Sequence, residues 1–106
     1  MRIKYSPSAG DKLQQMKKRV GKKVVGTIVS DIRKLSDNPR QCPSVEKMIG
    51  IPSPYFFLHV EHNYVFYRID GNIIYIVDIY NEREDFMWKM FGRRLRTQES
   101  FDYWGE

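Results

Sequence analysis

Residues 55–86, YFFLHVEHNYVFYRIDGNIIYIVDIYNEREDF, contain three strand-like runs at Tyr55–Val60, Tyr64–Ile69 and Ile73–Tyr80. A polar corner at residues 61–63 separates the first two runs, and Asp-Gly-Asn at 70–72 separates the last two. Asp-Gly supplies the positive φ values that a tight hairpin requires. We therefore expect an antiparallel three-stranded unit, with a charged segment after it that begins a helix.

Alternation along these runs divides their side chains between two faces, because successive residues of a strand point in opposite directions. The first face is apolar and suits a core: Phe56, Leu58, Val60, Val65, Tyr67 and Ile69. The opposite face is mainly aromatic: Tyr55, Phe57, His59, Tyr64, Phe66 and Arg68. Since a sheet covered on one side normally turns polar residues to water, this aromatic face is unusual.

The N-terminal half predicts one strand and two helices. Arg2–Ser6 alternates weakly, and Ser8 is a candidate N-cap for a helix that continues to Val20. Beyond Gly21, apolar residues recur on one face up to Leu35, and Asn38-Pro39 ends this second helix. A short strand is expected over Ser44–Ile49.

The predicted fold is α+β, in the order β-α-α-β-β-β, with the helical hairpin packed on one face of a small antiparallel-rich sheet. A short C-terminal helix from Glu82 to Gly92 completes one domain, 1–92, and residues 93–106 form a tail. A chain of 106 residues has room for one core.

Cys42 is the single cysteine, so neither an intramolecular disulfide nor a cysteine-based zinc site is possible. We expect no metal and no cofactor.

No apolar run approaches the roughly 20 residues that span a bilayer, and the first residues lack a signal-peptide core, so a cytoplasmic protein without a membrane partner is expected.

The charged residues are unevenly distributed: residues 1–50 carry 12 Lys/Arg against 4 Asp/Glu, and residues 51–106 carry 6 against 9. The excess is densest in a basic patch of Lys17, Lys18, Arg19, Lys22 and Lys23. It either binds nucleic acid or an acidic protein, or serves only solubility.

Three segments carry a resemblance to a known family: Leu35…Asn38-Pro39, residues 64–71 (YVFYRIDG) and residues 79–86 (IYNEREDF). In this order and spacing, the chain resembles the RelE/ParE toxin superfamily over roughly residues 1–91. The resemblance implies the growth-arresting toxin of a bacterial type II toxin–antitoxin module, of the kind associated with plasmid stabilisation. It also implies a cognate antitoxin, acidic and partly disordered, that the basic patch would attract.

RelE-like members cut messenger RNA on the ribosome by 2′-OH attack without a metal, using Lys and Arg on the sheet. The corresponding positions here hold Phe57, His59 and Tyr64, and Arg83 remains as the strong cation. If the chain is a ribonuclease, its expected catalytic residues are His59, His62, Tyr64 and Arg83. Whether the chain is an enzyme is left open.

ParE-like members poison DNA gyrase by protein binding and need no such cation cluster. Phe66-Tyr67-Arg68 and the segment 79–86 resemble them more closely, so gyrase is the preferred target and ribosome-bound message the alternative. Exposed aromatics with arginine are typical of interfaces. The candidate contacts to target or antitoxin are Phe57, Phe66, Arg68, Asp85 and Trp88. A degenerate, non-toxic interaction module is a third reading.

Overall fold

A computed structural model describes residues 1–50 and 52–84 of the chain. Four strands form one sheet in the order β1-β4-β3-β2: β1 (Arg2–Tyr5), β2 (Tyr55–Val60), β3 (Asn63–Asp70) and β4 (Ile73–Asn81). β1 pairs with β4 in parallel, and the other pairs are antiparallel. The predicted α+β arrangement is confirmed. The predicted C-terminal helix beyond Glu84 and the tail 93–106 lie outside the described residues.

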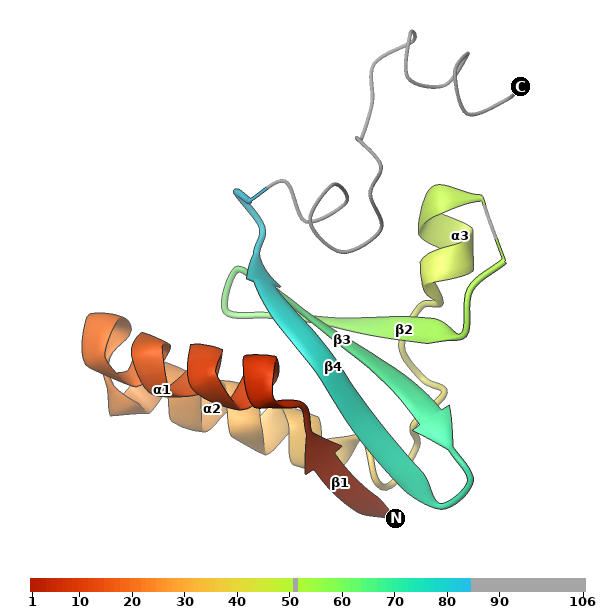
Figure 1. The fold of residues 1–106 in the computed structure, drawn as a ribbon, viewed down its shortest axis with the longest axis horizontal. Helices are drawn as coiled ribbons and strands as arrows, with labels where there is room; N and C mark the ends of the chain where they lie inside the picture. Colours follow the sequence, from red (N-terminus) through yellow and green to blue (C-terminus); the bar gives the residue numbers. More distant parts are fainter. Residues whose placement is uncertain (51, 85–106) are drawn as a thin grey trace, which may run out of the picture.

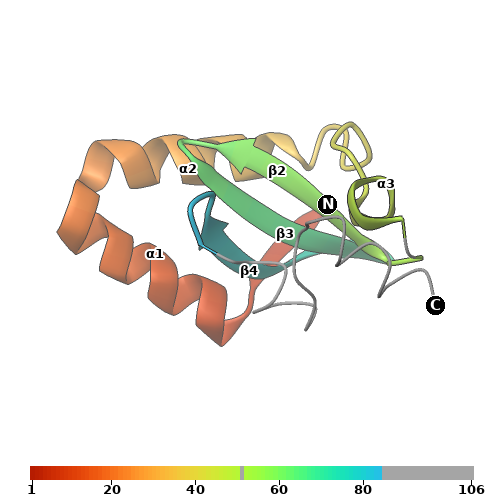
Figure 2. The same ribbon diagram turned by 90° about the horizontal axis from the view of Figure 1, so that it is seen from above.

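Two helices, α1 (Pro7–Val20) and α2 (Lys22–Lys34), form the predicted hairpin and cover one face of the sheet (Figures 1 and 2). Gly21, with a φ of 97°, makes the corner between them, a conformation that glycine adopts without steric cost. Among the described residues, no helix is long and apolar enough to cross a membrane.

The start of α1 differs from the prediction, because Ser6 rather than Ser8 is the N-cap. Its Oγ accepts a hydrogen bond from the backbone N–H of Ala9 at 3.0 Å and donates one to the carbonyl oxygen of Val77 at 2.6 Å. Pro7 then occupies the first helical position, where its missing N–H and fixed φ fit best. One serine therefore begins the helix and ties it to β4.

The main core lies between the helical hairpin and the sheet, and the predicted apolar face is confirmed. Val60, Val65 and Tyr67 are buried there, while Phe56, Leu58 and Ile69 are partly buried against it. The helices and β4 contribute the other buried residues: Ala9, Leu13, Met16, Ile28, Ile32, Leu35, Ile74, Ile76 and Ile79.

The predicted strand over Ser44–Ile49 is wrong: Val45–Ile49 forms a short helix, α3. The Ser44 side chain accepts from the N–H of Lys47 at 3.3 Å, and Gly50, with a φ of 73°, ends the helix in the left-handed conformation. These are ordinary helix start and stop signals, and they outweigh the short apolar alternation. Only a single bridge, from Ser44 to Phe56, is strand-like.

A register shift interrupts the pairing of β3 with β4. Phe66 pairs with Asp78 and Tyr67 with Ile76, so Val77 is an extra residue on β4. Such a bulge reverses the facing of the residues beyond it. As a result Ile79 joins the main core, whereas Tyr80 joins a smaller core on the opposite face.

Replacing Tyr67 by phenylalanine tests how the loop after α2 is held to the sheet. The buried Tyr67 hydroxyl donates to the carbonyl oxygen of Pro39 at 2.6 Å. Losing this bond should lower the free energy of unfolding by about 1 kcal/mol, measured by urea denaturation. Tyr5→Phe is the control, since no hydrogen bond of its hydroxyl occurs within the described residues. Equal effects of the two changes would contradict a structural role for this bond.

Candidate functional site

The aromatic face of the sheet is partly covered, in contrast to the prediction that it is displayed. Phe66 lies on the expected face, but its exposed fraction is 0%, and it packs with Val45 of α3 and with Tyr80. The rings of Phe57 and Tyr64 are half-buried beside it, and their centroids are 5.7 Å apart. Phe66 is therefore buried rather than displayed, and its contact with the target or antitoxin stays a prediction.

Arg68 lies on the same face, where it pairs with Tyr55 at the start of β2. Its guanidinium carbon is 4.6 Å from the centroid of the Tyr75 ring, a cation–π arrangement on a half-buried surface. The other two candidate contacts, Asp85 and Trp88, lie outside the described residues.

At the opposite end of this face, the structure brings together three of the predicted catalytic residues, with Glu82 between them. Nε2 of His59 is 2.7 Å from one carboxylate oxygen of Glu82, and Nδ1 of His62 is 3.3 Å from the other. Tyr64 stacks on His59 with ring centroids 4.8 Å apart. His59, His62, Tyr64 and Glu82 are called the histidine–glutamate cluster below.

Glu82 is the member of the cluster that the sequence pattern does not indicate, although the strand register explains its position. Asn63 pairs with Asn81, so the residue after Asn81 must lie beside the corner between β2 and β3. Arg83 is exposed and follows directly; its N–H donates to the Asn81 side chain at 2.9 Å.

That corner is strained. Glu61 and His62 have φ values of 49° and 64°, the left-handed conformation of a two-residue type I′ hairpin, which normally uses Asn or Gly. Two contacts from Glu82 offset this backbone strain. Its N–H donates to the His62 carbonyl oxygen at 2.8 Å, and its carboxylate lies 3.3 Å from Nδ1 of the His62 ring. The histidine–glutamate cluster thus also fixes the corner.

The cluster has the composition of an acid–base site. A carboxylate is an acceptor, so it selects the tautomer in which each facing imidazole nitrogen carries the proton. The other nitrogen of each ring is then available to take a proton from a bound group. Hydrogen bonds, first from His59 and then from His62, hold the pKa of Glu82 below its ordinary value of 4.5. Within residues 1–50 and 52–84, no group of three side chains suits a metal ion.

A second polar network joins α1 to the bulge in β4. One carboxylate oxygen of Asp78 meets Lys12 Nζ at 2.8 Å and accepts from Ser8 Oγ at 3.0 Å. The other accepts from the Tyr80 hydroxyl at 2.9 Å, and Lys12 Nζ also lies 3.7 Å from the centroid of the Tyr80 ring. Burial, helped by Asp78, raises the pKa of Tyr80.

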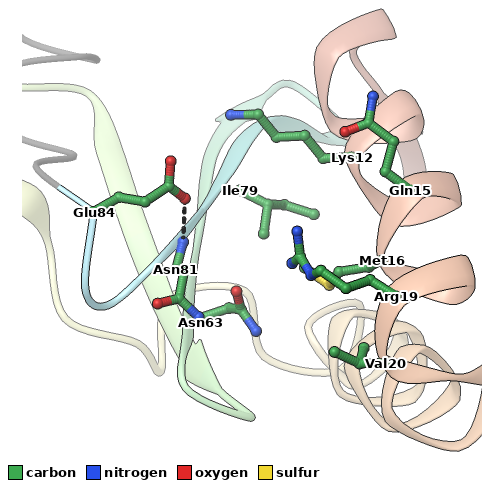
Figure 3. Close-up of a pocket in the computed structure, with 9 residues that line it drawn as sticks. All are labelled: Lys12, Gln15, Met16, Arg19, Val20, Asn63, Ile79, Asn81 and Glu84. Carbon is green, nitrogen blue, oxygen red and sulfur yellow. Dashed lines mark hydrogen bonds between the residues drawn. The ribbon is translucent and has the colours of Figure 1, made fainter.

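A pocket of about 410 Å³ opens between α1 and the ends of β3 and β4 (Figure 3). Cationic and amide groups line it together with apolar ones: Lys12, Gln15, Met16, Arg19, Val20, Asn63, Ile79, Asn81 and Glu84. At its edge a Glu84 carboxylate oxygen accepts from the Asn81 N–H at 2.8 Å. This pocket is on the helix-facing side of the sheet, and the histidine–glutamate cluster is on the other side.

Residues 3–86, more than half of the chain, match the family described as ParE toxin of type II toxin-antitoxin system, parDE. The chain belongs to the ParE toxin family. Its fold is also similar to a solved chain titled "Chromosomal ParDE TA system from P. aeruginosa", with a TM-score of 0.59 and 21% identity, covering 76% of this chain and 95% of that one. No curated protein matches the sequence.

In this ParE-family chain the basic patch is divided by the helix corner. Lys17, Lys18 and Arg19 lie in the last turn of α1, where cations favour the negative end of the helix dipole. Lys22 and Lys23 begin α2, at the positive end of its dipole, where cations are disfavoured. All five are exposed. The two lysines of α2 therefore have no local stabilising role that accounts for them.

Replacing Asp78 by asparagine should weaken the bulge network. Burial raises the pKa of Asp78, but hydrogen bonds from Lys12, the Ile79 N–H and Tyr80 outweigh it and leave the pKa below 3.8. A depressed folded-state pKa stabilises the protein above the unfolded-state pKa, and this stabilisation is lost as the pH falls through the folded-state pKa. At neutral pH we expect a loss of about 1–3 kcal/mol and a flatter acid dependence of urea unfolding. Asp31→Asn, which alters the longer and more solvent-exposed pair with Lys34 at 3.4 Å, is the control; a similar loss there would contradict the assignment.

Titration of the Glu82 carboxyl carbon by NMR tests the histidine–glutamate cluster. In His59→Ala its pKa should rise toward 4.5, because the hydrogen bond that most lowers it is lost. In His62→Ala the rise should be smaller, since that contact is longer, 3.3 Å against 2.7 Å. An unchanged Glu82 titration in His59→Ala would show that the cluster does not form.

Proposed function

We propose that this ParE-family toxin arrests growth by binding and poisoning DNA gyrase, acts in the cytoplasm, and is neutralised by a cognate antitoxin. The observation that supports gyrase as the target is the absence, on the described part of the sheet, of a cation cluster at the positions that ribonucleases use. Where ribosome-dependent ribonucleases carry Lys and Arg, the chain has Phe57, His59 and Tyr64. Phe57 and Tyr64 pack against the buried Phe66, so these positions support the sheet rather than a phosphate.

The aromatic face contributes less surface to gyrase than its sequence suggests, since α3 covers part of it. Phe57, half-buried, and Arg68, stacked on Tyr75, are the predicted contacts that remain at the surface of the described sheet. An arginine already ordered by stacking loses less side-chain entropy on binding. Together with Asp85 and Trp88, these residues form the proposed gyrase contact.

The antitoxin proposal is supported by the basic patch. Lys22 and Lys23 oppose the dipole of α2 and therefore cost stability in the free chain. An acidic partner lying along the helix corner would remove this cost and would be attracted from a distance. Antitoxin binding should consequently weaken as the salt concentration rises.

A second candidate function, cleavage of ribosome-bound message, is supported by the histidine–glutamate cluster. His59, oriented by Glu82, would take the proton of a ribose 2′-OH as that oxygen attacks the adjacent phosphorus. His62, in its doubly protonated imidazolium form, would give a proton to the departing 5′ oxygen, leaving a 2′,3′-cyclic phosphate, and Arg83 would balance the charge that develops on the phosphate. This arrangement supplies acid and base but a single described cation.

A supercoiling assay with purified gyrase tests the preferred function. We expect the wild-type chain to inhibit supercoiling and to accumulate cleaved gyrase–DNA complexes, and Arg68→Ala and Trp88→Ala to weaken inhibition by about tenfold or more, as for interface anchors. Glu82→Gln should inhibit like wild type, because the cluster has no role in gyrase binding.

The same proteins should be added to translating ribosomes, with the message ends mapped by primer extension. Message cleavage that Glu82→Gln and His59→Ala abolish, without gyrase inhibition, would replace the gyrase proposal by the ribonuclease one. Neither activity, with antitoxin binding retained, would identify a non-toxic interaction module.

A further inference from the structure

A row of side chains crosses the sheet on its aromatic face, at the end away from the histidine–glutamate cluster. Lys4 of β1 pairs with Tyr75 of β4, and Tyr75 pairs with Arg68 of β3. Arg68 in turn pairs with Tyr55 of β2. Because paired residues of neighbouring strands lie on the same face, cations and aromatic rings alternate along the row. Arg2, two residues before Lys4, lies on this face as well.

Arg2, Lys4, Arg68 and Tyr75 are called the cation–tyrosine surface below. None of the salt bridges between described residues involves its three cations. Arg2 and Lys4 are exposed, and Arg68 and Tyr75 are half-buried. The Tyr75 hydroxyl makes no hydrogen bond to another described residue. Within the part of the chain that the structure describes, the surface therefore offers four donors, three of them charged, that have no acceptor.

The spacing of these donors suits a ligand with several negative charges in series. Neighbouring strands are about 4.8 Å apart, so Lys4 and Arg68, which pair with β4 from its two sides, are separated by about 10 Å at the backbone. A single phosphate would meet only one or two of the donors. The backbone of a nucleic acid carries one phosphate for every nucleotide, and Lys, Arg and Tyr side chains are usual donors to these groups.

The tyrosines of the row do not favour a single strand as the ligand. Proteins that bind single-stranded nucleic acid stack the bases on open aromatic faces. The Arg68 guanidinium carbon is 4.6 Å from the centroid of the Tyr75 ring, so one face of this ring is already covered. Tyr55 packs against the smaller core that includes Val45 of α3. The surface therefore orders donors for a phosphate backbone and does not display rings for bases.

We propose that the cation–tyrosine surface binds the phosphate backbone of duplex DNA. Lys4 and Arg68 contact phosphates on either side of Tyr75, the Tyr75 hydroxyl donates to a phosphate between them, and Arg2 extends the contact along β1. The inference rests on the proposed gyrase function only for the setting in which the toxin meets DNA, since gyrase holds DNA while it is poisoned. The basic patch, on the helices that cover the other face of the sheet, stays assigned to the antitoxin.

Fluorescence anisotropy with a short labelled DNA duplex measures this binding on the full chain, without gyrase or antitoxin. We expect a Kd of about 10⁻⁴ to 10⁻⁶ M at physiological salt, the range of binding without sequence preference. Three cations on phosphates predict a slope of about −3 for the logarithm of the association constant against the logarithm of the salt concentration. Single-stranded DNA of the same length, an RNA duplex and a polyglutamate peptide should all bind more weakly than the DNA duplex.

Lys4→Gln and Arg68→Gln should each weaken duplex binding by about tenfold, as the loss of a charge-assisted contact predicts, and should each reduce the salt slope by about one. Tyr75→Phe keeps the ring on which Arg68 stacks and removes only the hydroxyl, so it should weaken binding by about threefold and leave the salt slope unchanged. Lys23→Gln is the matched control, because it removes the same charge from an exposed position on α2; its affinity and salt slope should be those of wild type.

An equal loss in Lys23→Gln would show that net charge rather than this surface binds DNA, and would overturn the proposal. Tighter binding of the single strand, the RNA duplex or polyglutamate would overturn it too, as would no binding of the DNA duplex. Failure of this proposal is distinguishable from failure of the gyrase proposal, because Lys4 and Tyr75 lie outside the proposed gyrase contact. Supercoiling inhibition without DNA binding would refute the surface alone, whereas DNA binding without inhibition would refute the gyrase target alone.

Discussion

The bulge at Val77 in β4 is the feature on which both cores depend. Up to Ile76 the strand pairs with β1 and turns Ile74 and Ile76 toward the helices. The extra residue then reverses the facing, so that Ile79 continues the main core while Tyr80 enters the smaller one. Without it, the strand would place Asp78 under the helices and Ile79 under α3. A buried, unpaired carboxylate there would be costly.

The same bulge explains how α1 is attached. β1 ends at Tyr5, so the later part of β4 has no strand neighbour on that side. Ser6 bonds to Val77, and Lys12 and Ser8 bond to Asp78. Polar contacts from a helix thus replace a strand at an exposed sheet edge, which also blocks pairing with another chain. These polar contacts also position the helix that forms one wall of the 410 Å³ pocket.

Local and period-two signals made most of the fold predictable. Asp70-Gly71 with its flanking alternation specified the last hairpin, and the inward set from Phe56 to Ile69 was correct because one buried face fixes strand register. The start of α1 was misplaced by two residues, since proline at the first helical position makes Ser6 the cap. The strand predicted over Ser44–Ile49 is wrong because six residues alternate too briefly to outweigh a serine cap and a glycine stop.

The candidate site was less predictable, since it depends on contacts between distant segments. His59, His62 and Tyr64 were selected from their chemistry, and the fold does bring them together. Glu82, 20 residues from His62 in the chain, reaches them only through the pairing of Asn63 with Asn81. Alternation assigns Phe66 to the correct face but cannot show that it is buried, because burial depends on what covers that face, here α3.

One short segment, residues 81–84, therefore serves both sides of the sheet end. Glu82 holds the strained corner and the two histidines on the aromatic side, while Asn81 and Glu84 form the edge of the pocket on the helix side. Their own hydrogen bonds, from the Asn81 N–H to Glu84 and from the Arg83 N–H to Asn81, keep the segment in one conformation. Because this one turn connects both groups, side chains on either face of the sheet can be exchanged separately while the turn itself remains.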